Sequence, residues 1–218
     1  MFNNRKMKTI PKYRKERKEV ARFMRRLYKH GLTTTSGGNI SMRITEDIIV
    51  ITPSATDKGR MRWKEVGIMN IFGENLTPEL KPSIESDMHI AIYKKKKEVT
   101  AIVHAHPVFA SSFTAMKAKI DTNLTAEACA ILGKPKTVPY ALMGTKELAN
   151  ITAEYILTSD ILLLENHGIL ATGSSLLQAF DKIEVLENAA KMTLITDMRG
   201  DKRPLIRTRV LEIEKQFR

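Results

Sequence analysis

Apolar side chains recur at helical spacing in three stretches of the chain, residues 13–31, 81–97 and 174–195. The apolar stripes are Val20, Phe23, Met24 and Leu27 in the first stretch, Ile84, Met88 and Ile92 in the second, and Leu176, Phe180, Ile183, Leu186 and Ala190 in the third. Residues three or four positions apart share one face of an α-helix, so each stretch predicts an amphipathic helix packed on a core. A shorter helical pattern covers residues 144–157.

Short apolar runs between these helices predict β-strands. They lie within residues 33–44, 46–55, 63–72, 99–106 and 160–168, and turns containing glycine or polar residues follow several of them. The chain shows no internal repeat, no low-complexity linker and no second compositional regime. Because helices and strands intermix along the whole sequence, we expect a single α/β domain.

Composition is typical of a globular protein. The 218 residues are 43 % apolar, but no apolar run approaches the roughly 18 residues that cross a bilayer, so no membrane partner is expected. The basic first residues are not followed by an apolar segment, which disfavours a secretory signal. Cys129 is the single cysteine, which excludes a disulfide framework and fits a cytoplasmic location.

The net charge of +12 comes from the two ends of the chain. Residues 1–30 hold 12 Lys or Arg against 2 Asp or Glu, residues 199–218 hold 7 against 3, and the segment between them has a net charge of −2. Aromatic residues do not alternate with the basic ones, as they do in single-strand nucleic-acid-binding proteins. We therefore expect a solvated basic face and no nucleic-acid partner, although this charge can attract an anionic substrate.

Three of the five histidines stand at the ends of predicted strands. His104 and His106 occupy alternate positions of "AIVHAHP", so their side chains point to the same side of a strand. His167 follows the next apolar run, directly before a glycine. Three imidazoles with an open fourth position are typical of a catalytic Zn²⁺ site, and Mn²⁺, Fe²⁺ or Co²⁺ can occupy the same cage. His30 and His89 lie on predicted helices, where a surface or helix-terminal histidine is the simpler interpretation.

Glu85 is the preferred carboxylate partner for such a metal, because it stands at the start of a predicted helix in "KPSIES". An acid that merely stabilises the helix dipole is the ordinary alternative. The loops "SGGN", "TPSA" and "KPS" offer small residues, hydroxyl groups and free backbone N–H groups. Such loops can hold phosphate without a charged side chain, although each one alone is also compatible with an ordinary turn.

Six motifs follow one another in the chain: "TSGGNIS", "ITPSA", "KPSIESDMHIAIY", "AIVHAHP", "VPYALMGTKELA" and "LLLENHG". Together they resemble the class II aldolase/adducin family, and most closely its L-fuculose-1-phosphate aldolase group. The resemblance covers about residues 15–200, which leaves a basic N-terminal tail at 1–14 and a C-terminal tail at 201–218.

The resemblance implies a three-layer α/β/α domain with a central, mainly antiparallel sheet, in a homotetramer with active sites at subunit interfaces. It implies one Zn²⁺ per chain on His104, His106 and His167, with Glu85 as a further ligand that leaves the metal to act as the base. The family's phosphate-binding positions match Gly38, Asn39, Ser54, Ala55, Ser83 and Ile84, where the family has glycine for Ala55 and serine for Ile84. Glu127 stands in the stretch where the family has a tyrosine, and it is a further candidate site residue.

The activity implied is metal-dependent cleavage of a ketose 1-phosphate to dihydroxyacetone phosphate and a short aldehyde. The metal would polarise the carbonyl group, and Glu85 would move a proton between carbon and hydroxyl. Pentulose-phosphate 4-epimerases, methylthioribulose-1-phosphate dehydratases and sugar-acid decarboxylases of the same fold are alternatives. The epimerases typically have Asp at the position of Glu85, which favours the aldolase. A non-enzymatic adducin-like binding module is disfavoured, because such modules lack the metal histidines.

Overall fold

The computed structural model describes residues 12–217, so most of the predicted N-terminal tail lies outside the described residues. The helices are α1 (Arg14–Lys29), α2 (Ser86–Lys95), α3 (Val108–Ser112), α4 (Ala126–Leu132), α5 (Lys146–Tyr155), α6 (Leu176–Arg199) and α7 (Arg207–Phe217), with 3-10 turns η1 (Lys58–Arg60), η2 (Trp63–Glu65) and η3 (Phe113–Ala115). The strands are β1 (Asn39–Arg43), β2 (Ile48–Ile51), β3 (Gly67–Asn70), β4 (Ala101–Ala105), β5 (Lys136–Val138), β6 (Ile161–Leu164) and β7 (Gly168–Gly173).

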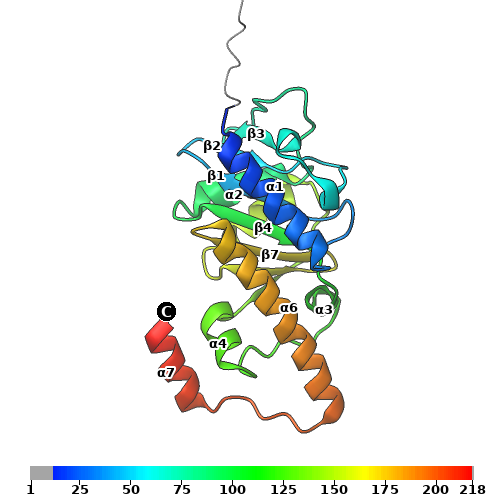
Figure 1. Cartoon of the computed structure of the whole chain (residues 1–218). Helices are drawn as coiled ribbons and strands as arrows, with labels where there is room; N and C mark the ends of the chain where they lie inside the picture. The colour runs from blue at the N-terminus through cyan, green and yellow to red at the C-terminus, as the bar shows by residue number, and fades with distance from the viewer. Residues whose placement is uncertain (1–11, 218) are drawn as a thin grey trace, which may run out of the picture.

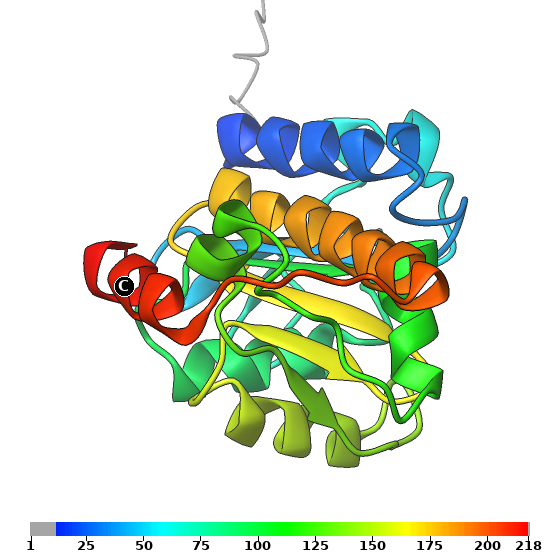
Figure 2. The same cartoon turned by 90° about the horizontal axis from the view of Figure 1, so that it is seen from below.

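The strands form one sheet in the order β3-β2-β1-β4-β7-β6-β5 (Figure 1). The β5–β6 pair is parallel, and the other neighbouring pairs are antiparallel. Helices α1 and α6 cover one face of the sheet, and α2 and α5 cover the other (Figure 2). The predicted three-layer α/β/α architecture with a mainly antiparallel sheet is therefore confirmed.

Strand residues alternate between two apolar cores, one on each face of the sheet. In β6, Ile161 and Leu163 pack in the core under α1 and α6, whereas Leu162 and Leu164 pack in the core under α2 and α5. This alternation is the period of two that a strand buried on both faces requires. It explains why β6 is an unbroken apolar run in the sequence.

The predicted helices hold for α1 and α6, whose apolar stripes are fully buried. The hydroxyl of Ser175 accepts a hydrogen bond from the backbone N–H of Gln178 and so caps the N-terminus of α6. The prediction was wrong for Ile84, which precedes α2 and is 51 % exposed. Pro82 lies in a β-bridge, a turn follows it, and the helix begins only at Ser86. Ile84 therefore lies outside the helix and does not share the face of Met88 and Ile92.

Two further elements differ from the predicted pattern. Residues Trp63–Glu65, read as the start of a strand, form the 3-10 turn η2, and β3 begins only at Gly67. The predicted C-terminal tail contains α7, which packs beside α4 and buries Val210. Within residues 12–217, none of the helices combines the length and apolar character that crossing a membrane requires.

Candidate metal centre

Neighbouring strands bring three histidines to one edge of the sheet. His104 is the fourth residue of β4, His106 follows that strand, and His167 lies in the turn between β6 and β7. Because β4 and β7 are antiparallel, the end of β4 meets the start of β7. The ligand atoms of the three imidazoles all lie within 4.8 Å of one another. The structure therefore unites the three histidines that the sequence analysis singled out.

Hydrogen bonding and burial prepare these imidazoles for a metal. The Nδ1–H of His104 donates to the carbonyl oxygen of Ile169 at 2.9 Å, which leaves its Nε2 as a lone-pair donor. The Nε2 atoms of His104 and His106 are 3.0 Å apart. Burial, and then the neighbouring imidazoles, lower the pKa of both histidines to about 3. Both rings are therefore neutral near pH 7, the form that ligates a metal.

Glu85 supplies a buried carboxylate beside the histidines. Its Oε2 accepts a hydrogen bond from Asn39 Nδ2 at 2.7 Å and lies 3.4 Å from His104 Nε2. Its Oε1 lies 3.3 Å from His167 Nε2 and has no hydrogen-bond partner among residues 12–217. Since His104 is neutral, its contact with the carboxylate is not an ion pair. A buried carboxylate oxygen without a partner, beside clustered imidazole nitrogens, fits a divalent cation that prefers nitrogen and oxygen ligands.

Glycines allow the chain to approach His106 closely. A Cβ atom on Gly168 would lie 2.4 Å from His106 Cδ2, and one on Gly37 would lie 2.8 Å from His106 Nδ1. Gly38 has a φ of +66°, and a Cβ there would lie 2.7 Å from the carbonyl oxygen of His104. Side chains at these positions would therefore displace the histidines.

The three loops predicted to hold phosphate lie side by side. The backbone N–H of Ser54 donates to the carbonyl oxygen of Lys81 at 3.1 Å, and Pro53 forms a β-bridge with Pro82. The backbone N–H of Lys58 donates to Thr35 at 2.9 Å, which links this pair to the "SGGN" loop. These contacts gather the loops of Gly38, Asn39, Ser54, Ala55, Ser83 and Ile84 next to Glu85.

Two of these loop positions depart from the family pattern, and the structure shows what each departure does. Ala55 has a φ of +49°, a left-handed conformation that glycine adopts more easily. Ile84 is 51 % exposed, so its side chain meets solvent rather than the core. The hydroxyl of Ser83 accepts a hydrogen bond from the backbone N–H of Glu85 at 3.3 Å, which ties this loop directly to the carboxylate.

Lys58 is a buried cation that the sequence analysis did not single out. It is 1 % exposed, and its Nζ donates to the carbonyl oxygen of Pro53 at 2.7 Å. Burial lowers the pKa of its ammonium group to about 8. No carboxylate of the described residues forms an ion pair with it. Its charge therefore lies uncompensated beneath the "TPSA" loop.

His89 is not the surface histidine that its helical position suggested. Its side chain is fully buried, with Nε2 2.5 Å from Asn39 Oδ1 and Nδ1 2.6 Å from Ser41 Oγ. The signal that could have identified it is its spacing from Glu85, because residues four apart on a helix share a face. By contrast, His30 caps the end of α1 and contacts Glu184 near the surface.

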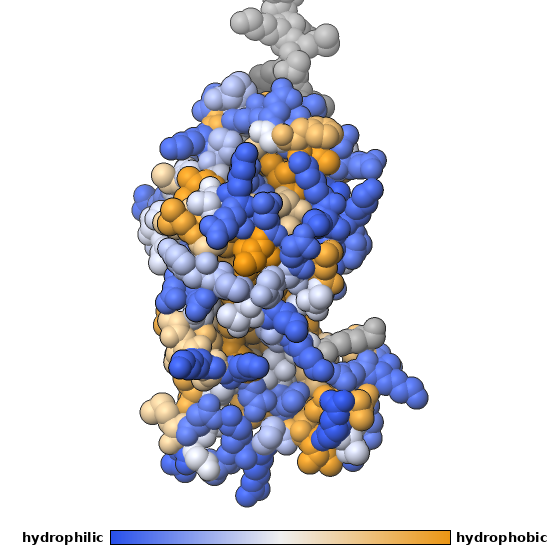
Figure 3. Space-filling view, turned by 180° about the vertical axis from the view of Figure 1, so that it is seen from behind, coloured by the Kyte–Doolittle hydropathy of each residue, from blue (hydrophilic) through white to orange (hydrophobic). Residues whose placement is uncertain are grey.

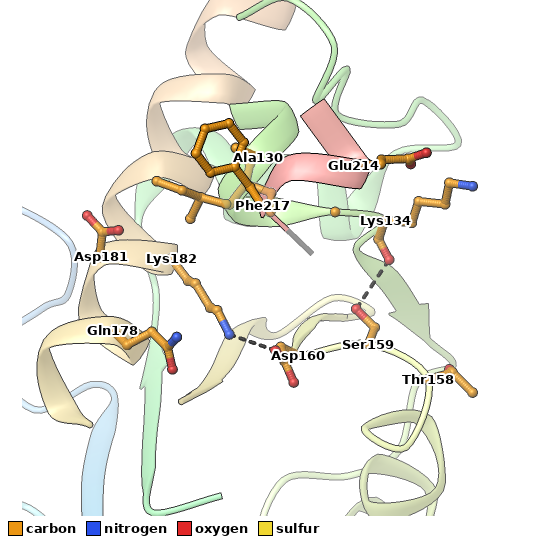
Figure 4. Close-up of a pocket in the computed structure, with 13 residues that line it drawn as sticks. Ala130, Lys134, Thr158, Ser159, Asp160, Gln178, Asp181, Lys182, Glu214 and Phe217 are labelled. Atoms are coloured by element: carbon orange, nitrogen blue, oxygen red, sulfur yellow. Dashed lines mark hydrogen bonds and ion pairs between the residues drawn. The ribbon is translucent and has the colours of Figure 1, made fainter. Parts of the chain in front are cut away.

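Glu127 lies apart from this cluster in the single chain. It is exposed in the first turn of α4 and lines a groove between α4 and α6. A larger cavity of about 750 Å³ is lined by other residues, and none of the three histidines is among them. Figure 4 shows its lining. Asp160 and Lys182 line it, and Lys182 Nζ donates to Asp160 at 2.7 Å and to Thr172 O at 2.9 Å. Lys96 donates to the same aspartate, so one carboxylate pairs with two ammonium groups in a structural ion-pair cluster.

Known proteins with similar sequences and structures include enzymes of one family. The model of the class II aldolase and adducin N-terminal domain matches residues 18–194. The chain is 33 % identical to a 3-oxo-tetronate 4-phosphate decarboxylase of Haemophilus influenzae over 88 % of this chain and 92 % of that protein. It is 30 % identical to a 5-deoxy-D-ribulose 1-phosphate aldolase of Bacillus thuringiensis over 93 % and 95 % of the two chains.

A solved structure shares the whole architecture. It is an L-fuculose 1-phosphate aldolase with a TM-score of 0.85 and 30 % identity, and the match covers 93 % of this chain and 96 % of that one. The family model, the relatives and the fold agree over nearly the full length described. The chain therefore belongs to the class II aldolase and adducin family.

Proposed function

We propose that the chain is a zinc-dependent aldolase that cleaves a ketose 1-phosphate, similar to L-fuculose 1-phosphate, into dihydroxyacetone phosphate and a short aldehyde. The observation that carries this proposal is the buried carboxylate of Glu85, with one unpartnered oxygen, beside three clustered imidazoles. Zn²⁺ is the ion we favour on His104, His106 and His167, because borderline nitrogen donors suit it. Mn²⁺, Fe²⁺ and Co²⁺ suit the same donors.

Each part of the site has a defined task in this reaction. When bound, the metal ion supplies a Lewis acid that polarises the substrate carbonyl. Glu85 accepts the proton of the C4 hydroxyl as the C3–C4 bond breaks, and it returns a proton to C3. Asn39 holds Oε2 of this carboxylate, so Oε1 is the oxygen left for proton transfer.

The phosphate group of the substrate would occupy the three adjoining loops. Ser54 and Ser83 offer hydroxyl groups, and Gly38 and Ala55 have the positive φ angles that turn successive backbone N–H groups toward an anion. The Asn39 amide uses one hydrogen on Glu85 and keeps a second for a phosphate oxygen. The uncompensated ammonium of Lys58 beneath the loop adds attraction for a dianion.

Apolar side chains near the site support assembly into a homotetramer with active sites at subunit interfaces. Ile84, Leu142 and Met143 are each about half exposed, and Gly144 packs against the carbonyl of Ile84. The face behind Figure 1 carries several separate hydrophobic patches among polar surface (Figure 3). Exposed Glu127 could then approach the site of a second subunit. Multi-angle light scattering should give about four times the 24.7 kDa chain mass, and a monomer would refute the tetramer.

A sugar-acid decarboxylase is the second candidate, because the Haemophilus influenzae relative with 33 % identity has that name. Both reactions break the bond between the α- and β-carbons of a carbonyl compound and leave an enolate that must then be protonated, so the same metal and proton carrier would serve either one. We also propose a cytoplasmic location, which the single buried Cys129 supports.

The decisive experiment combines metal analysis with two substrates. We expect about one zinc per chain and release of dihydroxyacetone phosphate from L-fuculose 1-phosphate, followed with a coupled glycerol-phosphate dehydrogenase. Release of carbon dioxide from 3-oxo-tetronate 4-phosphate without that cleavage would overturn the aldolase in favour of the decarboxylase. Absence of bound divalent metal after reconstitution would refute both.

A further inference from the structure

A buried chain of hydrogen bonds leads from Glu85 into the protein. Asn39 Nδ2 is 2.7 Å from Glu85 Oε2, and Asn39 Oδ1 is 2.5 Å from His89 Nε2. His89 Nδ1 is 2.6 Å from Ser41 Oγ, which is 2.8 Å from the hydroxyl of Tyr93. All five side chains are at least 95 % buried. No water is needed to complete this chain, because every link is direct.

The direction of each hydrogen bond follows from the carboxylate. An ionised Glu85 can only accept, so the Asn39 NH₂ faces it and the Asn39 carbonyl oxygen faces His89. That oxygen requires a hydrogen on His89 Nε2, which leaves Nδ1 of the neutral ring as an acceptor for the Ser41 hydroxyl. The Ser41 oxygen in turn accepts from Tyr93. Every donor therefore points toward Glu85.

The sequence builds this chain from two matched periods. Asn39 and Ser41 are two residues apart on β1, so they share one face of the sheet. Glu85, His89 and Tyr93 are four residues apart along α2 and its N-cap, so they form one stripe of that helix. This stripe of α2 packs on the face of β1 that carries Asn39 and Ser41. Successive members of the hydrogen-bond chain therefore come alternately from α2 with its N-cap and from β1.

We propose that His89 is a positioning residue for Glu85 and acts by fixing the orientation of the Asn39 amide. This inference deepens the proposed function and depends on Glu85 as the proton carrier. Without the donor at Nε2, the Asn39 carbonyl oxygen would be buried and unpaired. The amide would then gain by rotating its oxygen toward another donor, and it would no longer hold Oε2 of Glu85. The carboxylate would lose its fixed orientation toward the histidines.

Two variants separate this role from simple packing. His89→Phe keeps a planar ring in the buried site and removes both nitrogens. His89→Gln removes the ring but can return an N–H at the place of Nε2, so it should again donate to Asn39. A packing role predicts that phenylalanine is the better substitute, whereas a positioning role predicts that glutamine is.

The first measurement uses no substrate. Apoprotein of each variant is loaded with Co²⁺, whose visible absorption depends on the number and geometry of its ligands. We expect the wild-type spectrum in His89→Gln and an altered one in His89→Phe, because Glu85 is displaced only in the latter. The same spectrum in His89→Phe as in the wild type would overturn the proposal. This arm stands even if the sugar-phosphate chemistry proposed above fails.

The second measurement follows proton exchange at C3 of dihydroxyacetone phosphate. We expect His89→Phe to lower kcat about 10- to 100-fold, as loss of supporting hydrogen bonds around a metal site does, with KM changed less than about threefold. His89→Gln should recover most of this loss, and failure to exceed His89→Phe would contradict the proposal. If His89→Phe does not fold, Ser41→Ala, which removes the donor to His89 Nδ1, should lower kcat at least threefold, and an unchanged kcat would refute it.

Discussion

Replacing Lys58 by methionine should stabilise the protein at neutral pH and lose that advantage in alkaline solution. Burial lowers the pKa of the Lys58 ammonium from its ordinary 10.5 to about 8, because the charged form loses hydration inside the protein. Methionine has a similar length and flexibility but carries no charge to desolvate. The comparison therefore isolates the free-energy cost of burying this ammonium under the candidate phosphate loop.

The magnitude follows from the difference between the two pKa values. A tenfold change in proton affinity corresponds to about 1.4 kcal/mol. When Lys58 is protonated in both the folded and the unfolded state, the lowered pKa therefore reduces the free energy of unfolding by about 3 kcal/mol. The variant also loses the bond from Nζ to the carbonyl oxygen of Pro53, and an unpaired buried acceptor costs roughly 1–2 kcal/mol. We therefore expect Lys58→Met to raise the free energy of unfolding by about 1–2 kcal/mol at pH 7.

The pH dependence has a definite sign. Below the folded pKa of about 8, lysine is protonated in both states and the full cost is present. Between about pH 8 and 10.5 the unfolded chain binds more protons than the folded one, so the wild type gains stability relative to the variant as pH rises. By pH 10 the difference should have moved by about 2.5 kcal/mol, and the variant should be slightly less stable than the wild type.

Urea unfolding followed by the fluorescence of Trp63 measures this difference. Wild type, Lys58→Met and the exposed control Lys18→Met are compared at pH 7, 8, 9 and 10 at one protein concentration. The control should track the wild type at every pH. A difference between Lys58→Met and wild type that stays constant from pH 7 to 10 would show that the ammonium is not desolvated, and the reasoning would be wrong.

Three other substitutions test the site and its loops. His106→Ala should remove the metal and abolish turnover, measured by metal analysis and a cleavage assay. The control His30→Ala, at a half-exposed histidine, should keep both. Retained metal and activity in His106→Ala would exclude the three-histidine site. Glu85→Gln should keep part of the metal but slow C3 proton exchange at least about 100-fold, and exchange at the native rate would remove Glu85 as the base. Ala55→Gly should raise the free energy of unfolding by about 0.5–1 kcal/mol, because glycine adopts the positive φ of this position more easily. Ala91→Gly within α2 should lower the free energy of unfolding by about 1 kcal/mol. Equal effects of the two variants in urea unfolding would argue against strain at Ala55.

Local periodicity predicted the elements that lie on continuous apolar patterns. Prediction of α1, α6 and β4 required only the apolar spacing within each segment, with no information from elsewhere in the chain. The prediction for Ile84 was wrong because its spacing continues the apolar stripe of α2, whereas the helix begins only at Ser86, after Pro82 and the turn that follows it. The sequence pattern counts apolar residues, and it does not show where a turn interrupts the backbone.

The histidines could be predicted as a set because each one ends an apolar run. For His89, the four-residue spacing from Glu85 could have indicated a shared helix face, but its partners Asn39 and Ser41 lie about fifty residues earlier, and only the packing of α2 against β1 brings them together. Lys58 was missed for the same reason, because nothing in "TPSATDKG" shows that its ammonium turns inward to Pro53. Contacts made by the folded backbone determine the surroundings of both His89 and Lys58, and local sequence patterns do not show these contacts.

The antiparallel pairing of β4 with β7 determines when the proposed metal site can form. His104 and His106 leave the ribosome about sixty residues before His167, and the two strands can pair only after β7 has been made. A nascent chain therefore has two of the three imidazoles and no cage to hold them. In the proposed metalloenzyme, the complete three-histidine site can therefore take up its ion only after β7 has been synthesised.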